Sequence, residues 1–341
     1  MRIHFILEPD SADRFLELGR LAESLGFEAM WTANHLSARD PFLSFSALAR
    51  ESTSIRMGPV AISPFELHPL KMANQLFALN EMCQGRAQIV VGGGGGTSIA
   101  MHLKSGRYVM HQNMVSAVKE CVEFLKGVSS STPLTFSGET FQVDNYFPTW
   151  ASDEPPLIYV AATRPKMLRM ATNMADGIMF SDLTLGRLEE TMKIVNEGLT
   201  DNNRDKPSFR LNNLFSWHVK ENLAEAKAEA RRKLWVRGML MDWYISPALD
   251  PDECQLVADH MPAFIKAYTT NSPEIDGVPD SLVDKLLDEL TFTGDFNSVD
   301  ALIEKFHRFK DAGINEMGIR LYDDPAASIR LISETIGPEL R

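Results

Sequence analysis

The sequence predicts a (β/α)8 barrel, in which eight parallel strands alternate with helices around a closed sheet. Short apolar runs alternate with segments whose apolar residues recur at helical spacing. Eight such strands occur along the 341 residues. An open doubly wound sheet is the alternative, but eight units without a domain break favour closure. We assign residues 1–341 to one domain, with insertions after the fourth and seventh strands; the second insertion covers approximately residues 245–290 and is a candidate lid.

The predicted strands are short apolar runs, several rich in β-branched side chains, as expected where both faces of a sheet are buried. The third strand contains Gly58 and Pro59. A central strand tolerates this pair only where its backbone is locally special. The predicted strands cover residues 3–7, 27–32, 55–62, 86–91, 157–161, 177–180, 210–219 and 317–321.

Glycine and proline mark the helix ends. Gly26 follows the first helix in the usual C-terminal position, and Pro69 suits the first turn of the third. Residues 129–141 form a linker and a small hairpin. The predicted helices cover residues 15–25, 41–52, 69–84, 111–127, 165–175, 188–199, 223–241, 300–313 and 326–336.

Composition excludes several classes of partner. The net charge is −12 and no block of Lys or Arg occurs, so neither nucleic acid nor an anionic membrane is expected to bind. No run approaches the ~18 apolar residues of a membrane span, and the apolar start is too short for a signal peptide. Three cysteines without CxxC spacing indicate reduced thiols in a cytoplasmic protein. No His, Cys or carboxylate spacing is typical of a metal site, so we expect no metal.

Five glycines, residues 92–96, follow the fourth strand. Each costs backbone entropy on folding, which is justified where the backbone must approach a ligand closely; a flexible loop is the alternative. No Walker or dinucleotide fingerprint is present. In a barrel, the loops after the strands meet at one mouth, where the active site lies. The residues predicted at this mouth are Glu8, Asn34, His35, Ile62, Ser63, residues 92–97, residues 161–164, Ser181, His218 and Arg320.

Four motifs occur in order along the chain. They are Gly26-Phe27-Glu28-x-x-Trp31-Thr32-x-x-His35, then Gly58-Pro59 with Pro64 and His68-Pro69, then Gly85-Arg86, and finally Pro165-Lys166-Met167-Leu168 with Ala175-Asp176-Gly177. With these motifs the chain resembles the bacterial luciferase-like family of flavin- and deazaflavin-dependent oxidoreductases, and within it the methylenetetrahydromethanopterin reductase branch. The resemblance covers the first 180 residues and the last strand and helix. It is weak between Trp217 and Gly313, the region that usually shapes the substrate pocket.

The resemblance implies a reduced flavin or deazaflavin ring in the barrel mouth, backed by a non-proline cis peptide bond between Val60 and Ala61. The glycine loop would pass near the ring and its ribityl chain. The cofactor phosphate would meet backbone N–H groups after the fifth strand and near Gly177. The cofactor-binding residues implied in this way are Val60, Ala61, Ser63, Gly92, Gly93, Gly94, Thr97, Ala161, Ala162, Thr163, Arg164 and Gly177.

Three residues are candidates for catalysis. The family counterpart of His35 lies near the reactive face of the ring, where an imidazole gives or takes a proton; a histidine bonded to a local carbonyl is the alternative. Asn34 stands where the deazaflavin branch commonly has aspartate, and an amide donates a hydrogen bond to a ring carbonyl or substrate but carries no charge. His218, beside Trp217, is a candidate wall of the substrate pocket.

Arg164 stands where close relatives often have glycine in the phosphate loop. Its guanidinium suits the phosphate monoester of FMN, whereas the deazaflavin cofactor F420 continues as a diester. We therefore favour a two-component monooxygenase that uses reduced FMN from a separate reductase, and O2, on a small organic substrate. One alternative is an F420-dependent reductase or dehydrogenase that transfers hydride without O2, supplied by a deazaflavin reductase. Another is a flavin-binding protein without catalysis. A homodimer is expected, since the family commonly pairs through barrel helices.

Overall fold

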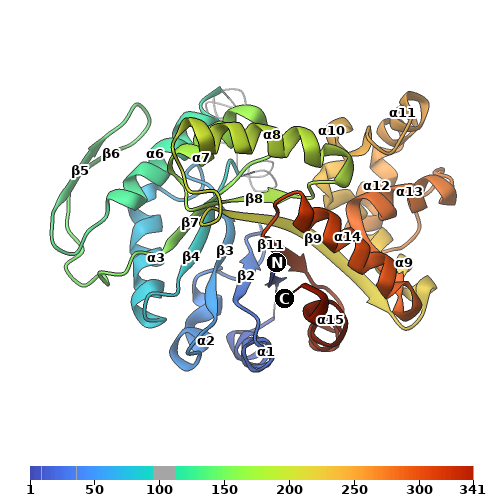
Figure 1. Ribbon diagram of the computed structural model, residues 1–341, viewed down its shortest axis with the longest axis horizontal. Coiled ribbons are helices and arrows are strands. Elements are labelled where there is room, and N and C mark those ends of the chain that lie inside the picture. Colours follow the sequence, from blue (N-terminus) through green and yellow to red (C-terminus); the bar gives the residue numbers. More distant parts are fainter. Residues whose placement is uncertain (9, 36, 95–111, 341) are drawn as a thin grey trace. The chain divides into compact units, whose positions relative to one another are not determined.

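A computed structural model describes residues 1–8, 10–35, 37–94 and 112–340. Its parallel strands form a closed (β/α)8 barrel, which confirms the predicted fold class (Figure 1). Along the sheet the eight barrel strands follow the order β9-β11-β1-β2-β3-β4-β7-β8, and an additional β8–β9 pairing closes it. The barrel strands are β1 (Arg2–Leu7), β2 (Ala29–Ala33), β3 (Arg56–Ile62), β4 (Gln88–Val91), β7 (Leu157–Ala161), β8 (Gly177–Ser181), β9 (Arg210–Lys220) and β11 (Glu316–Arg320).

The first and third helices carry the end signals that the sequence marks. Ser11 accepts a hydrogen bond from the Arg14 backbone N–H at the start of the first helix, and Gly26 follows its end at a φ of 80°. His68 caps the third helix through its ring, and Pro69 occupies the first turn. None of the helices that the structure describes combines the length and the hydropathy that crossing a membrane requires. The helices outside the insertion are α1 (Ala12–Ser24), α2 (Ser46–Glu51), α3 (Pro69–Met82), α6 (Met114–Gly127), α7 (Pro165–Met174), α8 (Leu185–Asp201), α14 (Val299–Asp311) and α15 (Pro325–Leu340).

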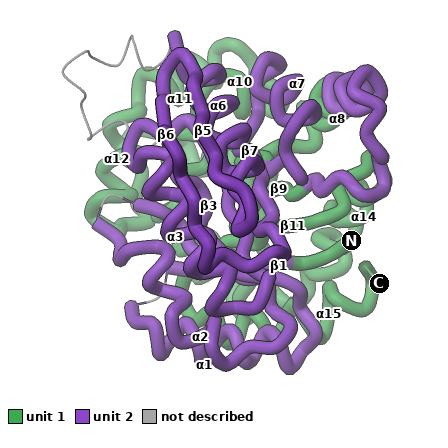
Figure 2. Tube along the Cα trace, turned by 90° about the vertical axis from the view of Figure 1, so that its left-hand side faces the viewer, with its two compact units in different colours: residues 1–3, 180–193, 212–341 green, residues 4–179, 194–211 purple. Residues whose placement is uncertain are grey.

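The chain packs as two compact units (Figure 2). Unit 1 comprises residues 1–3, 180–193 and 212–341, and unit 2 comprises residues 4–179 and 194–211. The assignment of the whole chain to one domain stays a prediction. Each unit is described by itself below.

In unit 2, a hairpin of β5 (Leu134–Ser137) and β6 (Gln142–Tyr146) confirms the predicted one. Its turn is held by the buried carboxylate of Glu120 on α6. This carboxylate accepts hydrogen bonds from the backbone N–H groups of Glu139, Thr140 and Phe141 at 2.9–3.2 Å. A carboxylate with three such donors is well satisfied out of water, so the hairpin is fastened to α6 rather than loose.

In unit 1, the helix predicted over residues 223–241 ends early. Helix α9 (Leu223–Lys233) is followed by two short turns, η2 (Leu234–Val236) and η3 (Gly238–Leu240). Gly238 has a φ of 56°, and a Cβ there would lie 2.4 Å from the Tyr244 ring, so the chain turns where only glycine fits.

The following segment, which contains the predicted insertion, is helical. It contains α10 (Asp242–Ile245), α11 (Pro251–Asp259), α12 (Met261–Thr269) and α13 (Asp280–Leu290). These helices share a hydrophobic core that includes Val257, Phe264 and Leu286. Residues 245–290 are therefore a packed subdomain-like layer within unit 1.

A ninth parallel strand, β10 (Thr291–Asp295), was not predicted and is followed by a short turn, η4 (Phe296–Ser298). It pairs with the last five residues of β9, from Thr291 opposite Ser216 to Asp295 opposite Lys220. Strand β11 pairs with the preceding part of β9, from Asn212 to Ser216. Phe292 is the only large apolar residue of β10, and Gly294 interrupts it, so the segment lacks the apolar run of the other strands.

Candidate active site

The ends of β3, β4 and β7 bring together three of the predicted cofactor-binding residues in unit 2. A Cβ at Gly92 would lie 3.0 Å from the Ala161 Cβ and 3.3 Å from the Ala61 Cβ. The Val60–Ala61 peptide bond is cis, as predicted. Three small residues thus pack together at the carboxyl ends of neighbouring strands, the end of a barrel where active sites lie.

The glycines after β4 are required for different structural reasons. A Cβ at Gly93 would lie 2.3 Å from the Met114 Sδ, so packing against α6 already requires glycine there. Gly94 has a φ of 85°, a conformation that glycine adopts without strain. Thr97, predicted to bind cofactor, lies outside the described residues. Packing also accounts for Gly92, because a Cβ there would be crowded by the Cβ atoms of Ala61 and Ala161.

The loop after β7 leads into the start of α7. The Ala162 N–H donates to the Met179 backbone oxygen at 3.2 Å, which ties the end of β7 to β8. Thr163 and Arg164 follow, and the exposed Arg164 is the residue before the first turn of α7. Among the described residues no side chain caps this turn, and helix N-termini without such caps can bind anions. The phosphate site around residues 162–164 stays a prediction.

Gly177 is a correction to the predicted cofactor site. It begins β8 and therefore lies at the amino end of that strand, whereas Ala161 ends β7. A Cβ at Gly177 would lie 2.5 Å from the Arg210 backbone oxygen and 2.8 Å from the Tyr159 ring. Close packing explains this glycine, and its place at the amino end of β8 is away from the strand ends where the cofactor site was predicted.

His35 pairs with Glu8 at the ends of β2 and β1. The His35 Nδ1 lies 3.1 Å from the Glu8 Oε1, and the two side chains are 48% and 35% exposed. A carboxylate at this distance orients the imidazole. The role of His35 as a proton donor or acceptor stays a prediction.

Asn34 and Ser63 are joined by a residue that sequence reasoning missed, Glu66. The Glu66 Oε1 accepts hydrogen bonds from the Asn34 Nδ2 and from the Ser63 backbone N–H, both at 2.7 Å. The Asn34 Nδ2 also lies 3.3 Å from the backbone oxygen of Ala61. The predicted residues Asn34, Ala61 and Ser63 thus form one hydrogen-bonded group.

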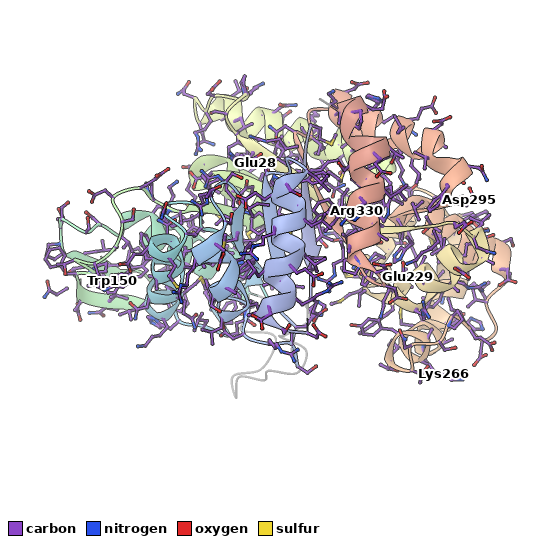
Figure 3. The ribbon with its side chains drawn as sticks, turned by 90° about the horizontal axis from the view of Figure 1, so that it is seen from below. Glu28, Trp150, Glu229, Lys266, Asp295 and Arg330 are labelled. Carbon is purple, nitrogen blue, oxygen red and sulfur yellow. The ribbon has the colours of Figure 1, made fainter. Side chains whose placement is uncertain are left out.

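In unit 1, His218 is fully buried near the end of β9. Its Nδ1 lies 2.7 Å from the Glu229 Oε2, and its ring stacks on Tyr322 with centroids 5.1 Å apart. Figure 3 labels Glu229, whose other oxygen accepts from Lys220 at 2.8 Å. Burial lowers the pKa of His218, although Glu229 opposes this effect. Burial acts to raise the pKa of Glu229, but the hydrogen bonds from His218 and Lys220 reverse the direction and lower it. A neutral imidazole that donates to an ionised carboxylate results.

The His218 Nε2 is therefore a buried nitrogen that can accept a proton or a hydrogen bond. With the proton on Nδ1, the His218 Nε2 carries a lone pair, and this atom is buried without a hydrogen-bond partner among the described residues. His218 therefore stays a functional candidate. Because its ring is fully buried, it does not line an open pocket as predicted.

His218 also makes stability depend on pH. Folding lowers the pKa of His218. At about pH 6.5 His218 therefore takes up a proton in the unfolded chain but not in the folded protein. Stability is expected to be complete above that pH and to fall below it. The Glu229 contribution is lost separately, below about pH 4.5.

His218→Gln, which keeps a donor for Glu229, should flatten the dependence of the urea midpoint between about pH 7 and about pH 5.5. His307→Gln, on α14, is the control; equal slopes for both variants would contradict the expectation.

A second buried pair in unit 1, Asp182 with Arg237, was also missed. Asp182 directly follows β8 and is 1% exposed. It accepts hydrogen bonds from the Arg237 Nη1 at 2.9 Å and the Gly238 backbone N–H at 3.0 Å. The Arg237 Nη2 donates to the Tyr322 hydroxyl at 3.1 Å. Burial raises the pKa of Asp182, an effect that Arg237 opposes. The pair fastens the start of the insertion to the ends of β8 and β11.

A closed barrel with these groups at its strand ends is the architecture of a barrel enzyme. The family model described as luciferase-like monooxygenase matches residues 4–316. The chain therefore belongs to the luciferase-like monooxygenase family, and it is an oxidoreductase of that family.

Individual relatives are named either as reductases or as monooxygenases. The chain is 24% identical over 326 residues to a 5,10-methylenetetrahydromethanopterin reductase of Archaeoglobus fulgidus, which covers 94% of each chain. The solved coenzyme F420-dependent tetrahydromethanopterin reductase of Methanopyrus kandleri superposes with a TM-score of 0.78 at 17% identity, covering 100% of this chain and 99% of that one. The monooxygenase RslO1 of Streptomyces bottropensis superposes with a TM-score of 0.68 at 17% identity, covering both chains completely. At these identities, the structural matches show the fold alone.

Proposed function

We propose that the protein is the oxygenating component of a two-component monooxygenase that binds reduced FMN and acts with O2 on a small organic substrate. The observation that carries this choice is Arg164, exposed at the uncapped N-terminus of α7. A guanidinium beside free backbone N–H groups suits the doubly charged phosphate monoester of FMN. The name of the monooxygenase RslO1 agrees with this proposal.

The residues of this chain have separate tasks in the proposal. Residues 162–164 and the first turn of α7 bind the phosphate. Ala61, Gly92 and Ala161 admit the ring against the backbone. The Glu8–His35 pair holds a proton at the His35 imidazole. Bound reduced flavin supplies the electrons for oxygen chemistry, and the protein orients the substrate and excludes water.

An F420-dependent reductase or dehydrogenase is the second candidate. It is supported by the names of relatives, since both the Archaeoglobus and the Methanopyrus proteins are called reductases and the latter is called coenzyme F420 dependent. The strand ends that would admit an isoalloxazine ring would admit a deazaflavin ring equally well. In this case the same His35 would donate or accept a proton while hydride moves between cofactor and substrate.

Cofactor titration and anaerobic turnover separate the candidates. FMN and F420 are titrated into the purified protein, and each binding cofactor is then tested reduced, with and without O2. Tight binding of FMN and oxygen consumption above that of free reduced flavin would support the monooxygenase. Selective binding of F420 with anaerobic turnover would replace it with the reductase. Binding without turnover would indicate a flavin-binding protein without catalysis.

Arg164→Ala is expected to weaken FMN binding about tenfold to a hundredfold, the loss of a charge-assisted hydrogen bond to the phosphate. Riboflavin, which lacks the phosphate, should bind both forms equally. Isothermal titration measures both ligands. Arg169→Ala, an exposed arginine of the same helix, is the control. Equal losses for FMN and riboflavin would mean that Arg164 acts through structure.

We also propose a homodimer that receives reduced flavin from a separate reductase. Four apolar residues that follow β2 and β3 are buried within unit 2 and supply no free surface for a dimer: Phe42, Phe45, Leu48 and Leu79. Leu43, in contrast, is 70% exposed on η1 (Leu43–Phe45). Light scattering at micromolar concentration tests the dimer, and a monomer would contradict it.

A further inference from the structure

The side-chain amide of Asn34 lies between two groups that only accept hydrogen bonds. Its Nδ2 donates to the Glu66 Oε1 at 2.7 Å and to the Ala61 backbone oxygen at 3.3 Å. A carboxylate and a carbonyl have no hydrogen to give. An amide turned by 180° would place its oxygen against both acceptors, so only one orientation is compatible with these neighbours.

Glu66 also holds the backbone around the cis peptide bond. The same Oε1 accepts from the Ser63 backbone N–H at 2.7 Å, and the Glu66 N–H donates to the Ser63 oxygen at 3.1 Å. The Asn34 N–H in turn donates to the Val60 oxygen at 3.1 Å. One carboxylate thus connects the end of β2 with the residues on the carboxyl side of the Val60–Ala61 bond.

The remaining polar atom of this group is the Asn34 Oδ1. Asn34 is half-buried, and Oδ1 accepts no hydrogen bond from the described residues. Both amide hydrogens are engaged within the protein. Asn34 therefore offers a ligand an acceptor, the opposite polarity from the donor that the sequence suggested.

We propose that Glu66 is a positioning residue of the cofactor site. By holding the Asn34 amide, it presents Oδ1 as a hydrogen-bond acceptor beside Ala61, where the register of β3 with β4 shifts between Val60 and Ile62, and selects a ring that carries an N–H or O–H donor at that point. The inference rests on the proposed function, in which the ring lies against the backbone at Ala61.

The first test needs no ligand. Asn34→Asp sets a second carboxylate within 2.7 Å of Glu66. Two negative charges at this distance repel each other, so the pKa of one of the two carboxyl groups rises. The variant should melt well below the wild type at about pH 8 and recover part of the difference at about pH 5, where a shared proton restores a donor. In Asn34→Asp/Glu66→Gln the added amide supplies the donor, and the pH dependence of the difference should disappear. The same pH dependence in both backgrounds would overturn the arrangement.

The second test measures ligand selection with FMN and with F420, by fluorescence titration at about pH 8. Asn34→Leu and Glu66→Leu should each weaken binding of the accepted cofactor about fivefold to tenfold, the range for one neutral hydrogen bond. Asn34→Asp/Glu66→Gln keeps an oxygen facing the ring and should bind within about twofold of the wild type. Glu81→Gln, on the exposed side of α3, is the matched acidic control.

The outcomes separate this inference from the proposed function. A cofactor that binds Asn34→Leu as tightly as the wild type would overturn the presented acceptor. A Glu66→Leu variant with lower melting temperature but unchanged affinity would reduce Glu66 to a structural role and likewise overturn the proposal. Failure of the wild type to bind either FMN or F420 would contradict the proposed function, while the ligand-free series would still decide whether Glu66 orients residue 34.

Discussion

Replacing Asp182 with alanine is expected to lower the free energy of unfolding by about 3–5 kcal/mol. The reason is the partner left behind: Arg237 is 7% exposed at its side chain and would remain as a buried charge without a counterion. The Gly238 backbone N–H would lose its acceptor as well. Urea unfolding followed by circular dichroism measures the loss.

Two variants test the explanation. Asp182→Ala/Arg237→Met removes both charges, and because an apolar replacement of a buried pair is often neutral or stabilising, most of the loss should be recovered. Asp323→Ala removes an ion pair with Arg232 in which the carboxylate is 65% exposed, and it should cost less than about 1 kcal/mol. Equal losses for Asp182→Ala and the double variant would show that the buried charge is not the cause.

Replacing His35 with glutamine should reduce turnover about 10²–10⁴-fold, the usual contribution of a positioned acid or base. Glutamine keeps a polar side chain near Glu8 but cannot exchange a proton near neutral pH. The KM and the cofactor affinity should change little, because the imidazole contributes to the proton transfer rather than to binding. The measurement is the ratio of kcat values with the cofactor that the protein accepts.

The control for His35 is again His307→Gln. Added imidazole should restore part of the activity of His35→Gln, but not of a variant damaged in its fold. Loss of cofactor affinity in parallel with kcat would assign His35 to binding instead.

Local signals predicted the barrel well. Most barrel strands are short apolar runs, although β9 has 11 residues and includes polar side chains. These runs alternate with helical segments and with turn residues such as Gly26 and Gly85, and this alternation located all eight strands. The same signals failed after β9. The helix predicted over residues 223–241 ends at Lys233, and the residues that follow are mostly apolar; among them the Arg237 side chain pairs with Asp182, 55 positions away, and Gly238 turns the chain. A contact between such distant residues has no local signature.

The candidate site was likewise predicted only in part. The cis bond at Val60–Ala61 and the small residues Gly92 and Ala161 were expected from the family motifs, and the structure has them at strand ends. Gly177 was misplaced because a glycine required for packing and one required by a ligand look alike in sequence. Glu66 was missed because a single carboxylate in a loop gains its meaning only from Asn34, 32 positions earlier in the chain.

Strand β10 gives the insertion a defined frame. The chain leaves β9 after Lys220 and rejoins the same strand opposite Ser216, so residues 221–290 connect two parallel strands that are already hydrogen-bonded neighbours. Such a crossover needs only a dozen or so residues. The rest of the segment is longer than the connection requires, and its contacts include the buried pairs of Glu229 with His218 and of Arg237 with Asp182.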